Sequence, residues 1–431
     1  MSKEENRKNF SKYVSQNILG MIGFSCYVLA DSYFISIAKG ADGLTALNLV
    51  MPLYSIIFSI GEMIGVGSAI RYAISKIKKD ADADDYFWNA LIWCILSSML
   101  FVFAGIFFSA DIMRVLGADE HIVAVGNNYT KIFMCFAPMF MCNYVTNAFV
   151  RNDGAPGIAM SATLFSSLFN IVFDYILMFP MNLGMEGAAL ATALSPIIGM
   201  GICSIHFFSK KSSVRLVVCK PSVRKLVAGS QLGVSAFVGE MSSAVITLAF
   251  NFVILKLTGN VGVAAYGVVA NIAIVTTAVF NGVAQGSQPL ISSCFGRGNK
   301  DGCTQLKRMG YTTAFVLAAV MYSILFIFAE QFVAVFNSEG SEMLRLYATE
   351  GVKLYFIGIF FAGINIVSGG AFSATEDAFK AAVVSVARGF VLILGAVFVM
   401  SALFGMTGVW LAYAVAEGIT TFIMLVMVLR V

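Results

Sequence analysis

The stretch LGMEGAALATALS, residues 183–195, recurs in altered form as FGMTGVWLAYAVA, residues 404–416, which lies 221 positions later. Three further pairs keep this offset: Gly61 and Gly282, Gly65 and Gly286, and Lys79-Asp80 and Lys300-Asp301. A chance match of a few glycines is common, whereas a constant offset over several segments is not. The sequence therefore predicts two repeats of one architecture.

The composition places these repeats in a membrane. Of the 431 residues, 59% are hydrophobic and only 12% are charged, and the mean hydropathy is +0.84. An average soluble domain carries roughly 25% charged residues. The first thirteen residues are polar and basic, and the apolar run after them has no small-residue cleavage site. This pattern predicts a first transmembrane helix and not a removed signal peptide.

Apolar segments long enough to cross a bilayer recur along the whole chain. We expect twelve spans, at residues 14–38, 46–70, 88–110, 130–150, 157–180, 187–208, 232–256, 264–291, 310–332, 353–374, 380–403 and 406–430. The predicted fold is an all-α polytopic membrane protein with two six-helix lobes. The lobes are residues 1–208 and 230–431, joined by a basic cytoplasmic linker, 209–229. Because six is even, both lobes insert in the same sense, which predicts a pseudo-two-fold axis along the membrane normal.

The distribution of positive charge predicts the orientation. Most of the 28 lysines and arginines fall at the N-terminus, in the linker and in the loops on the same side. The opposite side holds Lys39, Arg114, Lys131, Lys256, Arg345 and Lys353, and Arg388 lies inside a span. Because basic loops stay in the cytoplasm, we expect both termini to be cytoplasmic. The expected location is the cell's inner (plasma) membrane, crossed many times by a monomer.

Several functional classes find no support in the sequence. The eight cysteines form no CxxC pair and no zinc spacing, and they are typical of apolar packing residues. The sequence has no phosphate-binding GxxxxGK[ST] loop, no HExxH motif and no convincing nucleophile motif. We therefore expect no enzyme activity, no cofactor beyond a coupling ion such as H⁺ or Na⁺, and no nucleic-acid partner.

Two aspartates lie inside predicted spans. Asp174 interrupts the apolar run FNIVFDYILMFPM, residues 169–181, and Asp31 lies in the first span. A charge at mid-membrane costs roughly 2.5–3.5 kcal/mol on insertion scales. Counting from the span ends places both carboxyl groups about 10 Å below the outer surface. Asn170 lies one helical turn from Asp174, and Thr192 lies at a similar depth.

These four residues are predicted to surround one polar cavity. Desolvation favours the neutral form of a carboxyl group, which suits it to bind and release protons near neutral pH. Asp31, Asp174 and Asn170 could equally hold a sodium ion with their oxygen atoms. The alternative is a hydrogen-bonded pair that only holds helices together.

The chain resembles the multidrug and toxic compound extrusion (MATE) transporters over nearly its full length. The resemblance is carried by two six-helix repeats and by four motifs in order: LADSYFIS (29–36), FVRNDGAP (149–156), FNIVFDYILMF (169–179) and GVAQGSQPLISSCFGRGN (282–299). The motifs are most similar to the prokaryotic branch that includes the DinF and MepA types. The resemblance implies an exporter of small amphipathic, cationic drugs, driven by inward flow of protons or sodium ions.

The same resemblance implies roles for particular residues. Asp31 and Asp174 would form the coupling-ion site, assisted by Asn147, Asn170 and Thr192. Tyr129, at the mouth of the fourth span, is a further candidate. Glu240 matches a cation site that other branches use in the second lobe. Those branches often pair it with an aspartate in the tenth span, where this chain has Asn365 and Ser368.

Three further charged residues lie inside predicted spans. Glu62 is a further candidate in the second span, and Arg388 and Glu417 are expected to form a structural ion pair. A flippase for lipid-linked or polysaccharide substrates has a similar doubled architecture, but it usually has a strongly cationic cavity. A channel or membrane receptor is the alternative from another class. The expected partners are drugs and membrane lipids.

Overall fold

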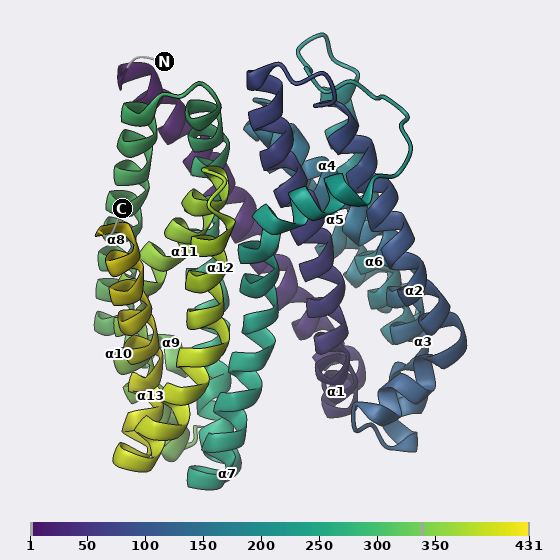
Figure 1. Cartoon of the computed structure of the whole chain (residues 1–431). Helices are drawn as coiled ribbons and strands as arrows, with labels where there is room; N and C mark the ends of the chain where they lie inside the picture. The colour runs from purple at the N-terminus through teal and green to yellow at the C-terminus, as the bar shows by residue number, and fades with distance from the viewer. Residues whose placement is uncertain (1–2, 338–339, 430–431) are drawn as a thin grey trace. The chain divides into compact units, whose positions relative to one another are not determined.

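The computed structural model describes residues 3–337 and 340–429, and these residues form helices and connections without a strand (Figure 1). Arg430, which ends the last predicted span, lies outside them. The α-helices in chain order are α1 (Lys3–Lys78), α2 (Asp85–Val115), α3 (Glu120–Cys135), α4 (Ala137–Asn152), α5 (Pro156–Met178), α6 (Gly184–Phe207), α7 (Val223–Gly296), α8 (Lys300–Ile327), α9 (Ala329–Phe336), α10 (Glu342–Tyr355), α11 (Ile359–Ala374), α12 (Ala378–Val386) and α13 (Leu392–Leu429). A 3₁₀ turn, η1 (Phe356–Gly358), and a π-helical turn, η2 (Ala387–Val391), connect α10 to α11 and α12 to α13.

The longest helices contain two membrane crossings each. α1 has 76 residues and α7 has 74, so each would be about 110 Å long if straight, against a hydrocarbon core of about 30 Å. Both break at a glycine with positive φ, Gly40 (58°) in α1 and Gly259 (65°) in α7. α13 breaks in the same way at Gly405, where φ is 58°.

These breaks account for the number of spans. Nine helical segments of the described chain are long and apolar enough to cross a membrane when α1 is divided near Gly40, α10 is joined to α11 and α12 is joined to α13. The helices α3 and α4, bent by 46°, form a tenth span. Dividing α7 at Gly259 and α13 at Gly405 gives twelve crossings over residues 3–337 and 340–429. This count agrees with the prediction of twelve spans. Five of the helices begin about ten residues earlier than the predicted spans, at Lys3, Glu120, Val223, Lys300 and Glu342.

The backbone repeats along with the sequence. Gly184, at the start of α6, has φ of 52°, and its counterpart Gly405, 221 positions later, has φ of 58°. Both glycines lie in the repeated stretch quoted above. A positive φ of this kind is available to glycine at little steric cost and is strained for other residues. The repeat therefore preserves the turns that reverse the chain between successive spans.

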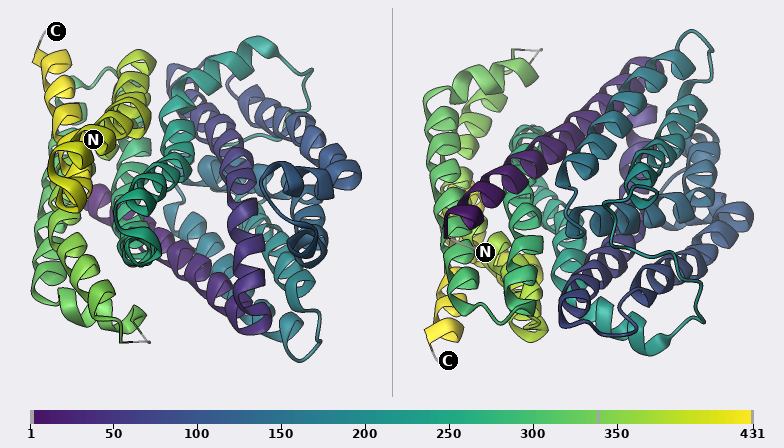
Figure 2. Two further views of the ribbon diagram at one scale, coloured as in Figure 1. Left: turned by 90° about the horizontal axis from the view of Figure 1, so that it is seen from below. Right: turned by 90° about the horizontal axis from the view of Figure 1, so that it is seen from above.

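The chain divides into two compact units. The N-terminal unit comprises Ser15–Phe237 and Ser292–Asn299, and the C-terminal unit comprises the residues up to Val14, Val238–Ile291 and those from Lys300 onward. The lobe boundaries drawn from the sequence, 1–208 and 230–431, stay a prediction. α7 already begins at Val223, so the non-helical part of the predicted linker 209–229 ends at residue 222. In both views of Figure 2, α2 to α6 form one bundle within the N-terminal unit.

Close helix packing in the N-terminal unit joins α6 to α5, which carries Asp174, and joins the second half of α1 to α4. A Cβ atom on Gly187 of α6 would lie 2.8 Å from the backbone carbon of Leu177 on α5. A Cβ atom on Gly61 of α1 would lie 2.9 Å from the Cα atom of Met141 on α4. Glycine at these positions lets the backbones approach, as is common between membrane helices.

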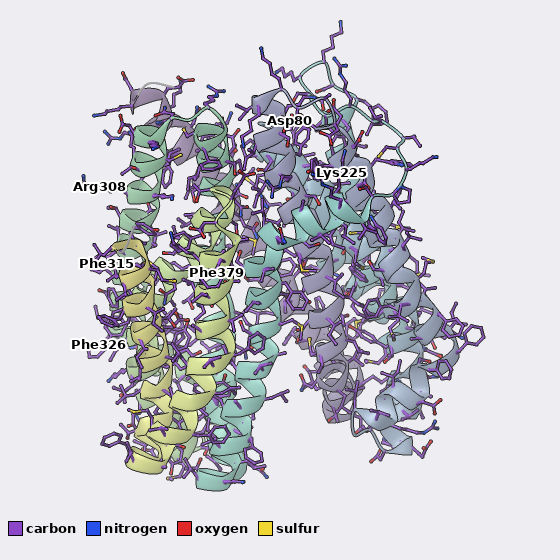
Figure 3. The ribbon with its side chains drawn as sticks, viewed as in Figure 1. Asp80, Lys225, Arg308, Phe315, Phe326 and Phe379 are labelled. Carbon is purple, nitrogen blue, oxygen red and sulfur yellow. The ribbon has the colours of Figure 1, made fainter. Side chains whose placement is uncertain are left out.

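The outward surface of both units is apolar. On α2, Leu96, Leu100, Phe103 and Phe107 share one helical face and are 51%, 69%, 56% and 63% exposed. In the C-terminal unit, Phe315 and Phe326 of α8 point away from the bundle and are 53% and 48% exposed (Figure 3). Large exposed apolar faces of this kind belong in contact with lipid. The chain is thus a multi-pass membrane protein.

Candidate functional site

The N-terminal unit brings the two predicted aspartates together. Asp31 lies on the first half of α1 and Asp174 on α5, and both are buried, with 6% and 0% exposure. Their carboxyl groups are close enough to interact electrostatically. The Oδ1 atom of each is shielded from solvent and has no hydrogen-bond partner among the described residues. Two neighbouring carboxyl groups in this state need a proton or a cation between them.

Asn170 and Thr192 lie beside Asp174, as the sequence predicts. Both are buried, at 0% and 2% exposure, and Asn170 is four residues before Asp174 on α5. One orientation of the Asn170 amide satisfies both of its ends. In this orientation its nitrogen donates to Asp174 Oδ2 over 3.0 Å and its oxygen accepts from Thr192 Oγ1 over 3.2 Å. The amide thus links the carboxyl group on α5 to the hydroxyl on α6.

Two tyrosines close the other side of this cluster. The hydroxyl groups of Tyr54, on the second half of α1, and Tyr129, on α3, are hydrogen-bonded to each other. Both interact electrostatically with Asp31 and Asp174. Tyr129 is fully buried and not at a mouth, because α3 begins at Glu120 instead of near residue 130. This corrects its predicted position and brings it into the cluster.

Tyr54 is absent from the sequence-based candidates. The ring of Tyr54 stacks on Phe133 with 3.6 Å between centroids and 16° between planes. In the sequence its only signal is a hydroxyl in an apolar run, two residues after Pro52. Other tyrosines of this chain stand in similar runs, so the pattern alone does not single it out.

Asn147 and Glu62 make other contacts. Asn147 Nδ2 donates to Ala159 O and Thr163 Oγ1, each over 3.2 Å, and thereby ties α4 to α5. Thr163 is seven residues before Asn170, about 10 Å along the helix. Glu62 is half-buried on α1 and interacts electrostatically with Arg151, which is 5% exposed. Roles for Asn147 and Glu62 in ion binding stay predictions.

The C-terminal unit has a different polar network, which balances its own charge. Arg388, in the π-helical turn η2, approaches Glu417 of α13 with 2.7 Å between Nη2 and Oε1. Asn365 of α11 donates to Glu417 Oε2 over 2.7 Å and accepts from Thr421 Oγ1 over 3.0 Å. The expected structural pairing of Arg388 and Glu417 is confirmed. Asn365, one of the two polar residues noted in the tenth predicted span, thus contacts Glu417.

Glu240 lies apart from these contacts. It is half-buried on α7, and no hydrogen bond to its carboxyl group occurs within the described part of the chain. Over the same residues, no group of three or more His, Cys, Asp and Glu side chains is placed to hold a metal ion. A cation site at Glu240 stays a prediction.

The comparison with known families decides the identity of this architecture. The MatE family model matches residues 17–176 and 236–399, one stretch in each repeat. The chain belongs to the MatE family. The two matched stretches correspond to the two repeats that the sequence shows. The first stretch includes both Asp31 and Asp174.

Similar proteins agree with this membership. The multidrug export protein MepA of Staphylococcus aureus strain MRSA252 is 27% identical over 414 residues, which cover 93% of this chain and 89% of that protein. MepA of Staphylococcus saprophyticus is 26% identical over 409 residues, with the same coverage. These relatives come from the branch that the motifs indicate.

Solved structures of the family share the fold. An outward-facing multidrug resistance MATE family transporter aligns with a TM-score of 0.92 at 20% identity, covering 99% of this chain and 96% of the other. A MOP superfamily transporter from Pyrococcus furiosus aligns with a TM-score of 0.90 at 20% identity, covering 98% and 95%. At this identity the likeness shows the fold, which is that of the MATE transporters.

Proposed function

We propose that this protein is a secondary exporter of small amphipathic, cationic drugs, which it exchanges for protons or sodium ions flowing inward. The proposal is supported by membership in the MatE family and by relatives named multidrug export proteins. It assigns the coupling ion to Asp31 and Asp174, assisted by Asn170 and Thr192. The expected setting is the plasma membrane, with both termini in the cytoplasm and the protein acting as a monomer.

The observation that carries the site assignment is the uncompensated pair of buried carboxyl groups. In the C-terminal unit the buried Glu417 is neutralised by Arg388. In the N-terminal unit no cationic side chain forms an ion pair with Asp31 or Asp174 within the described residues. A buried pair of this kind has a high affinity for any cation that reaches it. A proton satisfies one carboxyl group, and a sodium ion would use the oxygen atoms of Asn170 and Thr192 as well.

Such a site couples ion flow to export through competition between two states of the transporter. The ion drives a conformational change only to the extent that it binds one state more tightly than the other. Asp31 lies on the first half of α1, nine residues before the break at Gly40. Binding of an ion to Asp31 and Asp174 therefore acts on this half of α1. Release of the ion to the inside then restores the state that accepts drug.

The test of the site is neutralisation of each aspartate. We expect Asp31→Asn and Asp174→Asn each to reduce ion-driven uptake of an ethidium-like cation into proteoliposomes to the background of empty vesicles. Gel filtration and thermal unfolding should remain near those of the unmodified protein. Asp111→Asn is the matched control, because its side chain is 63% exposed. Normal export by both site variants would exclude the assignment.

The coupling ion is tested with the same vesicles under separate proton and sodium gradients. If sodium is the coupling ion, Asn170→Leu and Thr192→Val, which remove neutral oxygen ligands, should raise the sodium concentration needed for half-maximal uptake. If protons are, these variants should retain most of the pH-driven uptake. Drug flux that depends on neither gradient would contradict antiport and favour the channel class.

A further inference from the structure

The connection between α6 and α7 is held at both ends but leaves its middle exposed. At its start, Asp153 Oδ2 accepts from His206 Nε2 over 2.8 Å and from the backbone nitrogen of Ser213 over 2.9 Å. At its end, the backbone nitrogen of Ser222 donates to Asn89 Oδ1 over 2.6 Å. The connection is therefore an ordered surface of the N-terminal unit, seen at the upper end of Figure 1.

This surface, defined here as the linker surface (residues 208–225), carries positive charge without acidic residues. Lys225 already forms an ion pair, with 2.6 Å between its Nζ and Asp85 Oδ2. Figure 3 labels this lysine at the start of α7. Five other cations are exposed, and within the described residues they form no ion pair: Lys210, Lys211, Arg215, Lys220 and Arg224. Their charges are therefore available to an anionic group of another molecule.

Apolar side chains are exposed between these cations. Phe208 is 81% exposed, Leu216 53%, Val218 77% and Val223 60%. The contrast with Val214, which is 5% exposed, shows that the segment has a buried contact of its own. Exposed apolar residues interleaved with lysine and arginine are typical of segments that lie in a membrane interface.

The position of the segment along the bilayer agrees with this pattern. α6 has 24 residues and ends at Phe207, so it is about 36 Å long against a hydrocarbon core of about 30 Å. The residues that follow Phe207 therefore begin at the headgroup level. An acidic protein or a nucleic acid would account for the cations, but not for the exposed Leu216 and Val218.

We propose that the linker surface binds anionic phospholipid headgroups, with Leu216 and Val218 inserted among the acyl chains and the five free cations paired with phosphate groups. Each lysine or arginine near an anionic membrane surface contributes about 1 kcal/mol. The bound lipid would hold the connection between α6 and α7 flat on the membrane. The proposal goes beyond drug export and does not depend on it.

The experiment places a photo-reactive benzoylphenylalanine at position 218 of the full-length protein. The protein is reconstituted in nanodiscs of phosphatidylcholine containing a minority of phosphatidylglycerol, and mass spectrometry identifies the adducts after illumination. We expect lipid adducts in which phosphatidylglycerol is enriched roughly fivefold over its mole fraction, which corresponds to about 1 kcal/mol. The same group at position 214 should give adducts within the protein only.

Charge variants make the test specific. Lys210, Lys211 and Lys220 are replaced together by Gln, and Lys39, Lys131 and Lys256 are replaced by Gln in a matched control. We expect the first variant to lose the enrichment of phosphatidylglycerol and the second to keep it. The proposal fails if position 218 gives no lipid adduct, if both lipids react in proportion to their abundance, or if the two triple variants lose the enrichment equally.

Discussion

Asp174 and Glu417 are both buried carboxylates, with exposures of 0% and 2%, but their surroundings differ. Glu417 has a guanidinium and an amide on its oxygen atoms. Asp174 has an amide on one oxygen atom, a second carboxyl group nearby, and an Oδ1 atom without a partner in the described chain. The first arrangement is complete in itself, whereas the second leaves a carboxyl oxygen atom without a partner among the described residues. This difference supports the proposal that the ion binds in the N-terminal unit and that Glu417 has a structural role.

The ion pair between Arg388 and Glu417 leads to a prediction about stability. We expect Arg388→Met to destabilise the protein by about 3–5 kcal/mol, because it leaves Glu417 buried and uncompensated. The double variant Arg388→Met, Glu417→Leu should recover most of this loss, since an apolar pair of similar volume replaces the ion pair. Thermal unfolding in detergent micelles measures both. Arg114→Met breaks an exposed pair with Glu120 and should change the midpoint little.

The sequence predicts the aspartate site in part. Asp31, Asp174, Asn170 and Thr192 could be found because apolar runs make polar residues conspicuous, and because counting along straight helices gives their depth. Tyr54 and the position of Tyr129 could not, since they depend on how α1 and α3 pack. The same limit applies to Asn147, whose amide contacts Thr163 on α5. Depth along a helix can be read from a sequence, but the direction of a side chain around it is set by its neighbours.

The three glycine breaks are the elements that turn apolar segments into separate spans. Gly40, Gly259 and Gly405 have φ between 58° and 65° and ψ between −155° and −135°. This region is sparsely populated by residues with a Cβ atom, and strain there costs about 1–3 kcal/mol. Gly40 and Gly259 interrupt the first and second long helices, so each repeat opens with a pair of helices joined in the same manner.

Gly405→Ala tests this use of glycine. We expect a loss of about 1–3 kcal/mol in stability, because alanine is strained at φ of 58°. Gly395→Ala, in the same helix, is the control, since a Cβ atom there would meet nothing within 4 Å. The control should unfold at or slightly above the original midpoint in detergent micelles. Equal effects of the two substitutions would contradict the role of the break.

The contact between the start of α7 and the loop before α2 predicts a dependence on pH. The hydrogen bond from Lys225 lowers the pKa of Asp82 below its ordinary value of 3.8. Because the folded pKa is lowered, the stabilisation from Asp82 is present above pH 3.8 and is lost as the pH falls through the folded value. We expect Asp82→Asn to lower the unfolding temperature slightly at neutral pH, with the difference vanishing in acid. Lys225→Met, which removes the same hydrogen bond from the other side, should give a difference in the same direction at neutral pH.

Taken together, the two units combine a common scaffold with unequal chemistry. The repeat predicts two matched sets of helices and an even number of spans. It does not predict the polar residues. The position that matches Asp174 after the shift of 221 is Gly395, which has no carboxyl side chain. Duplication thus explains the fold, while the proposed coupling site lies in one copy. Under the proposed function, ion binding in one unit is enough to drive export.

The orientation of the chain in the membrane decides whether inward flow of the coupling ion can drive export. Labelling with a membrane-impermeant maleimide measures this orientation. We expect Glu120→Cys, at the turn between α2 and α3, to react in intact cells, because that side has few basic residues. Lys211→Cys, on the linker surface, should react only after the cells are permeabilised. The unmodified protein, which has eight cysteines, provides the background. The depths counted from the sequence place Asp31 and Asp174 nearer to the membrane surface on the side of Glu120 than to the surface on the side of Lys211. With the expected labelling pattern, an ion can therefore reach both aspartates from outside. The reverse pattern would load them from the cytoplasm, and inward ion flow could not drive export as proposed.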